Sequence, residues 1–246
     1  MKFSINFSIK VLALLMLPFL GFGQNKNLIT THRVFPKIDK VLEFEKALAA
    51  HAQKYHKGDA TWRVFEIMSG PDFGGYHIVE GPTSWTALDS RGNLGDEHNV
   101  DWNKTVTPFL TERQSASYSV YQDTLSTVAL GDFSEKINIT HIYPKIGMES
   151  RVRKVLDKLQ KAWAANGSTV AVYAVVSSGP TQFAITTRYK QGLKEREDGF
   201  RKPFRGVFDS VNGDDSFNAY LEEINECIDS AWSEMLLLRP ELGSKN

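Results

Sequence analysis

Several side chains in the first half of the chain are of types that can bind and transform a small planar molecule. Tryptophan and tyrosine rings stack on flat ligands, and a histidine, with a pKa near neutrality, can take a proton or bind iron. A neighbouring carboxylate can accept a proton. We expect a pocket between the sheet and the helices of this half. The candidate ligand-binding residues are His32, Trp62, Glu66, Tyr76, His77 and Trp85.

The second half of the chain lacks these groups at the matching positions. The motif "SGP" occurs at 69–71 and again at 178–180, an offset of 109 residues. Buried polar groups cost free energy unless they are paired, so their retention in one half indicates a ligand pocket there. The alternative is that Glu66 and Glu80 lie at exposed strand ends and that His77 is a hydrogen-bonded sheet histidine. On this alignment Trp62, Arg63 and Glu66 match Ala171, Val172 and Val175. Across the hairpin, with a two-residue deletion allowed, His77 and Glu80 match Ala184 and Thr187.

The other histidines give no indication of a metal site. His51 and His56 are five residues apart on an expected helix, so they do not share a face as an i, i+4 pair does. The chain contains no HExxH or CxxC motif, and we predict no metal site. His32 and His141 lie on equivalent strands but one residue out of alignment, so they should point to opposite faces. Each could bind haem or act as a base, although a core-strand histidine is the simpler interpretation.

Other chemistries find no support in the sequence. There is no GxGxxG, no Walker loop and no GxSxG, which removes the motifs of nucleotide-cofactor enzymes and serine hydrolases. The stretch 199–208, "GFRKPFRGVF", mixes cations with phenylalanines, but "KEREDG" and "NGDD" nearby cancel its charge. We expect a solvated loop with its phenylalanines packed on the core, or a lid over a pocket. The formal net charge of the chain is zero, so no nucleic-acid partner is expected.

A repeated phrase indicates a duplicated unit. "THRVFPKI" begins at Thr31 and "THIYPKI" at Thr140, and their prolines, Pro36 and Pro144, are 108 residues apart. In each half a strand, a helix, two strands around "SGP", helical material and a last strand follow one another, which is the ferredoxin-like order β-α-β-β-α-β. Residues 24–122 and 136–246 form the two repeats, with 123–135 as a linker. Strands such as "VAVYAVV" carry few charges on either face, so we expect the two sheets to cover each other.

The amino-terminal residues and the single cysteine bear on where the protein is found and how it is stabilised. Residues 1–23 carry Lys2 and Lys10 before an apolar run of 12 residues, which is typical of a signal peptide and predicts a periplasmic or secreted protein without a membrane anchor. Cys227 is the only cysteine and lies on an apolar helical stripe, so we expect it to be a buried packing residue. Stability must therefore come from a packed core rather than from disulfides.

The tandem ferredoxin-like units, the doubly buried strands and the phrase "SGP…Y…GP…W" resemble the dimeric α/β-barrel superfamily, with antibiotic biosynthesis monooxygenase-like and NIPSNAP-like domains as the nearest branches. The resemblance implies an α+β fold in which two tandem ferredoxin-like repeats pack as an intrachain pseudo-dimeric α/β barrel. Members of the superfamily include cofactor-independent oxygenases, haem-binding and haem-degrading enzymes and isomerases, so the fold alone chooses no reaction.

Two functional hypotheses remain open. In the first, the exported protein binds a small planar or aromatic ligand in the first repeat and is monooxygenase-like or haem-handling. In the second, it is a non-catalytic binding or interaction module on a duplicated scaffold. Haem is the one cofactor that the resemblance suggests, and no motif requires it. A small-molecule ligand and further homodimerisation are the expected partners.

Overall fold

The computed structural model describes residues 26–91 and 94–245. The predicted signal peptide, residues 1–23, lies outside the described residues. Within the described part of the chain, no helix is both long enough and apolar enough to cross a bilayer.

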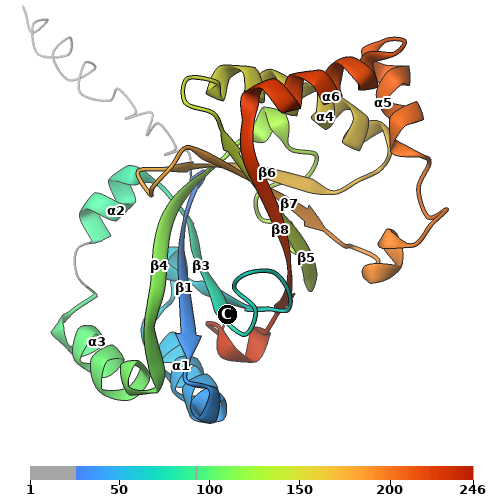
Figure 1. The fold of residues 1–246 in the computed structure, drawn as a ribbon. Helices are drawn as coiled ribbons and strands as arrows, with labels where there is room; N and C mark the ends of the chain where they lie inside the picture. The colour runs from blue at the N-terminus through green and yellow to red at the C-terminus, as the bar shows by residue number, and fades with distance from the viewer. Residues whose placement is uncertain (1–25, 92–93, 246) are drawn as a thin grey trace, which may run out of the picture.

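The described strands form one closed barrel (Figure 1). Its order is β1-β3-β2-β8-β5-β7-β6-β4, and every neighbouring pair is antiparallel. Each repeat contributes four adjacent strands in the ferredoxin-like order, and the seams are β2–β8 and β4–β6. The predicted α+β fold, an intrachain pseudo-dimeric α/β barrel, is confirmed. The strands are β1 (Leu28–Pro36), β2 (Trp62–Ile67), β3 (Tyr76–Thr83), β4 (Leu110–Tyr121), β5 (Lys136–Pro144), β6 (Val170–Val176), β7 (Gln182–Arg188) and β8 (Ile228–Leu238).

Helices cover the outside of the barrel at its two ends (Figure 1). The helices α1 and α3 lie with the strands of the first repeat, and α4, α5 and α6 lie with those of the second. A π-helical turn, Trp102–Val106, follows α3 directly. The α-helices are α1 (Val41–Tyr55), α2 (Trp85–Arg91), α3 (Asp96–Asp101), α4 (Glu149–Ala165), α5 (Phe204–Asn212) and α6 (Ser216–Cys227).

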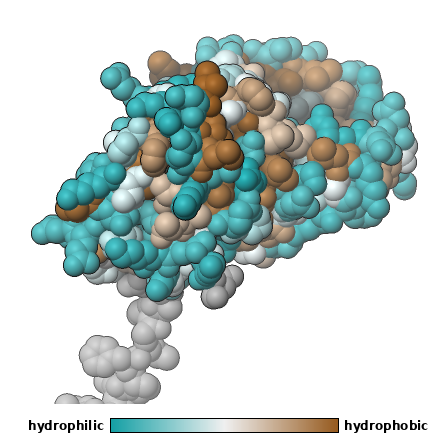
Figure 2. All heavy atoms as spheres, turned by 90° about the horizontal axis from the view of Figure 1, so that it is seen from below, coloured by the Kyte–Doolittle hydropathy of each residue, from teal (hydrophilic) through white to brown (hydrophobic). Residues whose placement is uncertain are grey.

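The apolar stripes predicted for the two long helices are the faces that they bury. Helix α1 places Phe44, Leu48 and Ala52 against the outer face of the first sheet, and α4 does the same with the stripe that includes Val152 and Leu156. Cys227 is buried in the core of the second repeat, as predicted. The segment 199–208 also packs against this core, because Phe208 is buried and contacts the rings of Phe217 and Tyr220. Seen from below, hydrophilic side chains cover the margins of the molecule and hydrophobic ones show between them (Figure 2).

The alignment of the two repeats needs a correction on one strand. Trp62 pairs with Glu80 across β2–β3, whereas Val170 pairs with Thr187 across β6–β7. Trp62 is therefore equivalent to Val170, 108 residues away, and the alignment through "SGP" is wrong by one residue on this strand. The second repeat has one additional residue before its turn, and Ser177 there adopts a left-handed conformation with φ +51°. In the corrected alignment Arg63 and Glu66 match Ala171 and Ala174.

Candidate functional site

Among the described residues, pockets lie on both faces of the first repeat's sheet. One, the inner pocket, lies inside the barrel and measures about 290 Å³. The other, the outer pocket, lies between this sheet and the segment that contains α3 and the π-helical turn, and measures about 430 Å³. A β-strand points alternate side chains to opposite faces, so each strand contributes to both pockets.

Three adjacent strands form the floor of the outer pocket. His32 on β1, Glu80 on β3 and Trp62 on β2 point outward from the sheet. Helical segments supply the wall: His56 directly follows α1, His98 lies on α3, and Trp102 begins the π-helical turn. Single π-helical turns are often found at functional sites.

The second repeat has no comparable polar lining. Val170, Thr187 and Thr140 occupy the positions of Trp62, Glu80 and His32. Instead of open space, a hydrophobic core fills the region beneath α4, α5 and α6. Its aromatic members are Phe183, Phe204, Phe208, Phe217, Tyr220 and Trp163.

Glu80 organises the floor of the outer pocket. The indole Nε1 of Trp62 donates a hydrogen bond of 2.8 Å to Glu80 Oε2, and His56 Nδ1 lies 3.3 Å from the same oxygen. The His56 ring also stacks on Trp62, with ring centroids 3.5 Å apart and an interplanar angle of 22°. The carboxylate thus holds two aromatic rings in a fixed orientation, and all three side chains are buried.

Two further histidines, His51 and His98, lie beside His56. His51 Nδ1 lies 2.8 Å from Asp101 Oδ2, and His98 Nε2 lies 3.2 Å from His56 Nε2. Burial lowers the pKa of His51 by more than its hydrogen bond with Asp101 raises it, so this imidazole is neutral at neutral pH. One ring nitrogen from each of His51, His56 and His98 lies within 4.8 Å of the others, a group able to hold a metal ion. We call these three residues the histidine cluster.

The spacing of His51 and His56 did not predict the histidine cluster, because a continuous helix would point the two rings to different faces. Helix α1 ends at Tyr55, and His56 has extended backbone angles, φ −98° and ψ 95°. The ring of His56 therefore returns toward His51, with centroids 5.4 Å apart. His98 comes from a segment 42 residues later, and nothing local in the sequence places it here.

An ion-pair network joins the two repeats inside the barrel. Arg33 on β1 hydrogen-bonds to both carboxylate oxygens of Glu234 on β8, and Arg33 Nη1 also donates to Asp72 Oδ2 at 2.6 Å. His141 Nε2 lies 2.8 Å from Glu234 Oε1, and its ring stacks on Trp232 at 4.0 Å. Burial alone would raise the pKa of Glu234, but the bonds from His141 and Arg33 outweigh it and hold the pKa at about 2.

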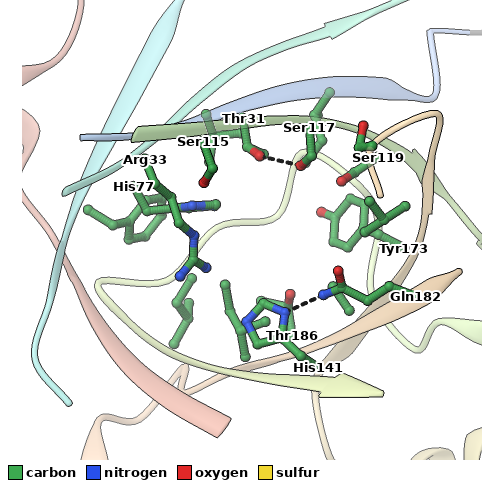
Figure 3. Close-up of a pocket in the computed structure, with 18 of the residues that line it drawn as sticks. Thr31, Arg33, His77, Ser115, Ser117, Ser119, His141, Tyr173, Gln182 and Thr186 are labelled. Carbon is green, nitrogen blue, oxygen red and sulfur yellow. Dashed lines mark hydrogen bonds between the residues drawn. The ribbon is translucent and has the colours of Figure 1, made fainter. Parts of the chain in front are cut away.

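Other polar side chains of the inner pocket form hydrogen bonds with one another, with His77 as an exception. Thr31 shares a hydrogen bond of 2.7 Å with Ser117 (Figure 3). Arg188 donates to the Tyr173 hydroxyl at 2.9 Å. His77 also points into this space from β3. Its Nδ1 has no hydrogen-bond partner among the described residues. Burial, followed by the positive charge of Arg33, lowers the pKa of His77 to about 3.

The six residues predicted to bind a ligand do not converge on one pocket. His32 and Trp62 lie in the outer pocket, whereas His77 lies on the opposite face of the sheet. Tyr76 is buried in the core of the first repeat, and its hydroxyl donates to Glu45 Oε1 at 2.6 Å. Glu66 accepts a hydrogen bond of 2.6 Å from Arg239, and Trp85 is half exposed beside Tyr118.

Comparison with known proteins shows a shared fold. No protein-family model and no curated protein matches the chain. Among solved structures, an anthrone oxidase-like protein is 15% identical and has a TM-score of 0.53, with 87% of this chain and 92% of that chain covered. A provisionally assigned monooxygenase from Lactobacillus acidophilus is 10% identical at a TM-score of 0.51, covering 89% and 95%. A chlorite dismutase mutant from Candidatus Nitrospira defluvii is 7% identical at 0.53, covering 88% and 93%. At these identities the likeness concerns the fold.

Proposed function

We propose that the outer pocket of the first repeat binds a small planar aromatic molecule and serves monooxygenase-like chemistry. The observation that carries this proposal is the contrast between the repeats. The first keeps indole and imidazole rings, a carboxylate and open space under its helices, whereas aromatic side chains fill the same region of the second. Open space beside hydrogen-bonded polar groups has no packing role, so a ligand is the simplest explanation.

The lining suits an aromatic ligand in shape and chemistry. A pocket of about 430 Å³ lies within the size range of small-molecule sites. The rings of Trp62 and Trp102 stand at 88° to each other with centroids 6.0 Å apart, so a flat ligand can stack on one ring and meet the edge of the other. His32 is exposed at this pocket, where an imidazole can exchange a proton with a phenol or an activated C–H group.

The fold of the anthrone oxidase-like protein supports the choice of a first probe. Anthrone is a flat tricyclic aromatic ketone with an acidic C–H group, which matches the ring-lined pocket and its histidines. The likeness is one of fold, and the pocket residues of this chain carry the proposal.

The outer pocket does not fit haem. The propionates of haem need cationic partners, and Arg33 is the one arginine or lysine among the described lining residues. Its guanidinium points instead into the barrel, where Glu234 and Asp72 bind it. We therefore expect no haem in this pocket, and a haemin titration serves as a comparison for the aromatic probe.

The test is a calorimetric titration of the protein with anthrone. We expect saturable 1:1 binding that weakens at least tenfold in Trp102→Ala, which removes a ring of the outer pocket. Trp232→Ala removes a ring of the inner pocket and is the matched control, with unchanged affinity expected. If only Trp232→Ala weakens binding, the ligand lies in the barrel and the proposal is wrong. Absence of saturable binding, or a saturable haemin Soret shift in its place, also contradicts it.

Oxygen uptake separates catalysis from simple binding. If the outer pocket serves monooxygenase-like chemistry, adding anthrone should start oxygen consumption, and His32→Ala should slow it more than it weakens binding. Binding without oxygen uptake would support the alternative, a binding module without catalysis.

The proposal includes export of the protein. Its support is the sequence of residues 1–23, with a basic start and an apolar run. Amino-terminal sequencing of protein recovered outside the cytoplasm should give a chain that begins at Gln24. Recovery of the uncleaved chain from the cytoplasm would contradict export.

A further inference from the structure

We propose that His51, His56 and His98 bind one divalent transition-metal ion of the zinc class. The inference goes beyond ligand binding in the outer pocket, and it stands on the histidine cluster alone. It contradicts the sequence-based expectation that the chain has no metal site.

The hydrogen bonds of the cluster leave three nitrogen lone pairs directed at one another. His51 Nδ1 faces the Asp101 carboxylate, His56 Nδ1 faces the Glu80 carboxylate, and His98 Nδ1 lies 3.2 Å from the Asn99 side-chain oxygen. All three partner atoms are acceptors, which favours a proton on each Nδ1 and a lone pair on each Nε2. His56 Nε2 and His98 Nε2 are 3.2 Å apart, and with both Nδ1 atoms protonated a cation between them would satisfy the two facing lone pairs.

His51 supplies the third nitrogen. Its Nε2 is buried and has no hydrogen-bond partner among the described residues. Burying an unpaired nitrogen is unfavourable, and a metal bond would satisfy it. The ring of His51 lies 5.4 Å from that of His56 and 4.8 Å from that of His98, measured between centroids.

The spacing is close to what a tetrahedral site requires. Zinc–nitrogen bonds of 2.0–2.1 Å place two ligand nitrogens about 3.4 Å apart. The His56–His98 separation already matches this value, and the three ligand atoms lie within 4.8 Å. A small rotation of the partly exposed His98 or of its neighbours would bring all three to one ion.

The carboxylates around the cluster match a divalent cation. Histidine ligands of metals usually donate their second N–H to a carboxylate, which fixes the ring and raises its basicity. Asp101 does this for His51, and Glu80 lies 3.3 Å from His56 Nδ1, so the two carboxylates bring two negative charges to balance the ion. Thr105 Oγ1 donates to Asp101 Oδ2 at 3.3 Å, and Trp62 donates to Glu80, so both carboxylates are themselves oriented.

Three protein ligands leave the fourth position of a tetrahedral ion for water or another small ligand. His56 and His98 both line the outer pocket, so that position would be reached from the pocket. Imidazole ligands favour zinc, copper, nickel and cobalt over magnesium or calcium.

The experiment is a titration of the full-length, chelator-treated protein with Co²⁺, followed by visible absorption, and then with Zn²⁺ in competition. No aromatic probe is present, so the result does not depend on the function proposed for the pocket. We expect one ion per chain, a tetrahedral Co²⁺ spectrum and displacement by Zn²⁺. His98→Ala should weaken binding at least 100-fold, and Asp101→Asn should weaken it about 10- to 100-fold.

His32→Ala is the matched control, because it removes a histidine of the same pocket that lies outside the cluster. Its affinity for Co²⁺ should equal that of the unchanged protein. Urea unfolding without metal should show that His98→Ala still folds, since this side chain is partly exposed. Equal affinities of the His98→Ala and His32→Ala variants, or no saturable 1:1 binding by the unchanged protein, would overturn the proposal.

Discussion

At the scale of single residues, Glu234 carries a buried charge that the folded protein must compensate. Its side chain has no exposed surface, and it receives hydrogen bonds from Arg33 and His141. Removing one partner of a buried ion pair leaves the other charge without compensation, which usually costs about 3–5 kcal/mol. The network therefore makes the stability of the barrel depend on one carboxylate that lies far from Arg33 in the sequence.

We predict that Glu234→Gln lowers the free energy of unfolding by about 3 kcal/mol, because Arg33 would keep only Asp72 as an anionic partner. Urea unfolding at pH 7 measures the loss. Glu241→Gln is the matched control, since Glu241 pairs with Arg239 but is 58% exposed, and its loss should stay below about 1 kcal/mol. Equal losses in the two variants would show that the buried network contributes no more than a surface pair.

His77 should make the stability of the protein depend on pH. Its pKa is about 3 in the folded protein, because burial and then Arg33 oppose protonation, whereas an unfolded histidine has a pKa of about 6.5. Between these values the unfolded chain binds a proton that the folded chain refuses, so stability falls as the pH falls below about 6.5. The slope from this residue is at most about 1.4 kcal/mol per pH unit.

Urea unfolding between pH 7 and pH 4 checks this prediction. His77→Gln should flatten the slope, whereas His32→Gln, a change at an exposed position, should leave it as it is. A slope that His77→Gln does not change would mean that His77 has the same pKa in the folded and the unfolded chain, which contradicts the prediction.

The sequence predicted the chemistry of these residues better than their positions. His32 and His141 point to opposite faces of the barrel wall, as their one-residue misalignment predicted. The face occupied by His77 depends on the register of β3, which no local pattern sets. The histidine cluster depends on where α1 ends and on how the distant α3 packs, and neither follows from residue spacing.

At the scale of elements, the two "SGP" turns share a backbone conformation but differ in what surrounds them. Gly70 and Gly179 both adopt positive φ angles, +91° and +102°, which side chains with a Cβ rarely adopt. A Cβ on Gly70 would lie 3.0 Å from Glu234 Cβ and 3.2 Å from the carbonyl oxygen of Ser233. A Cβ on Gly179 would have no atom within 4 Å. The first turn is thus packed against β8, and the second is open.

Alanine substitutions should separate these two contributions. Gly179→Ala should cost about 1–3 kcal/mol through backbone strain alone. Gly70→Ala should cost roughly 1 kcal/mol more, because the added methyl group also presses on β8 beside the buried ion pair. Thermal and urea unfolding of both variants measure the difference. If Gly179→Ala proves the more damaging change, packing against β8 is not what distinguishes the turns.

Element order could be read from the sequence because each element has a local signal: alternation for strands, a 3.6-residue stripe for helices and glycine for turns. Both repeats and the helices α1 and α4 follow these signals closely. The additional residue at Ser177 has no such signal, since it changes the register without changing the order of elements. The alignment of β2 with β6 was wrong for that reason.

At the scale of the whole molecule, the barrel depends on contacts between repeats that are not interchangeable. The seams β2–β8 and β4–β6 close the sheet, and Arg33 from the first repeat meets Glu234 from the second. In strand register, Ser117 pairs with Thr31 and Glu234 pairs with Ile139, so Ser117 occupies the position in the first repeat that Glu234 holds in the second. The duplicated sequence predicted that the sheets would pair, and only the register shows why each repeat needs the other.

We predict that residues 24–122 and 136–246, produced as separate chains, form the barrel only with each other. Alone, each sheet would leave two edges unpaired, and a homodimer of the first repeat would bury two copies of Arg33 with serine where Glu234 belongs. Co-expression with a tag on one piece should recover both in a 1:1 complex, and Glu234→Gln should weaken that complex far more than Glu241→Gln does. Circular dichroism and size-exclusion chromatography of each piece alone should show a poorly folded or aggregated chain. A separate first repeat that is monomeric and unfolds cooperatively would show that the repeats fold independently and that the cross-barrel ion pair is not required.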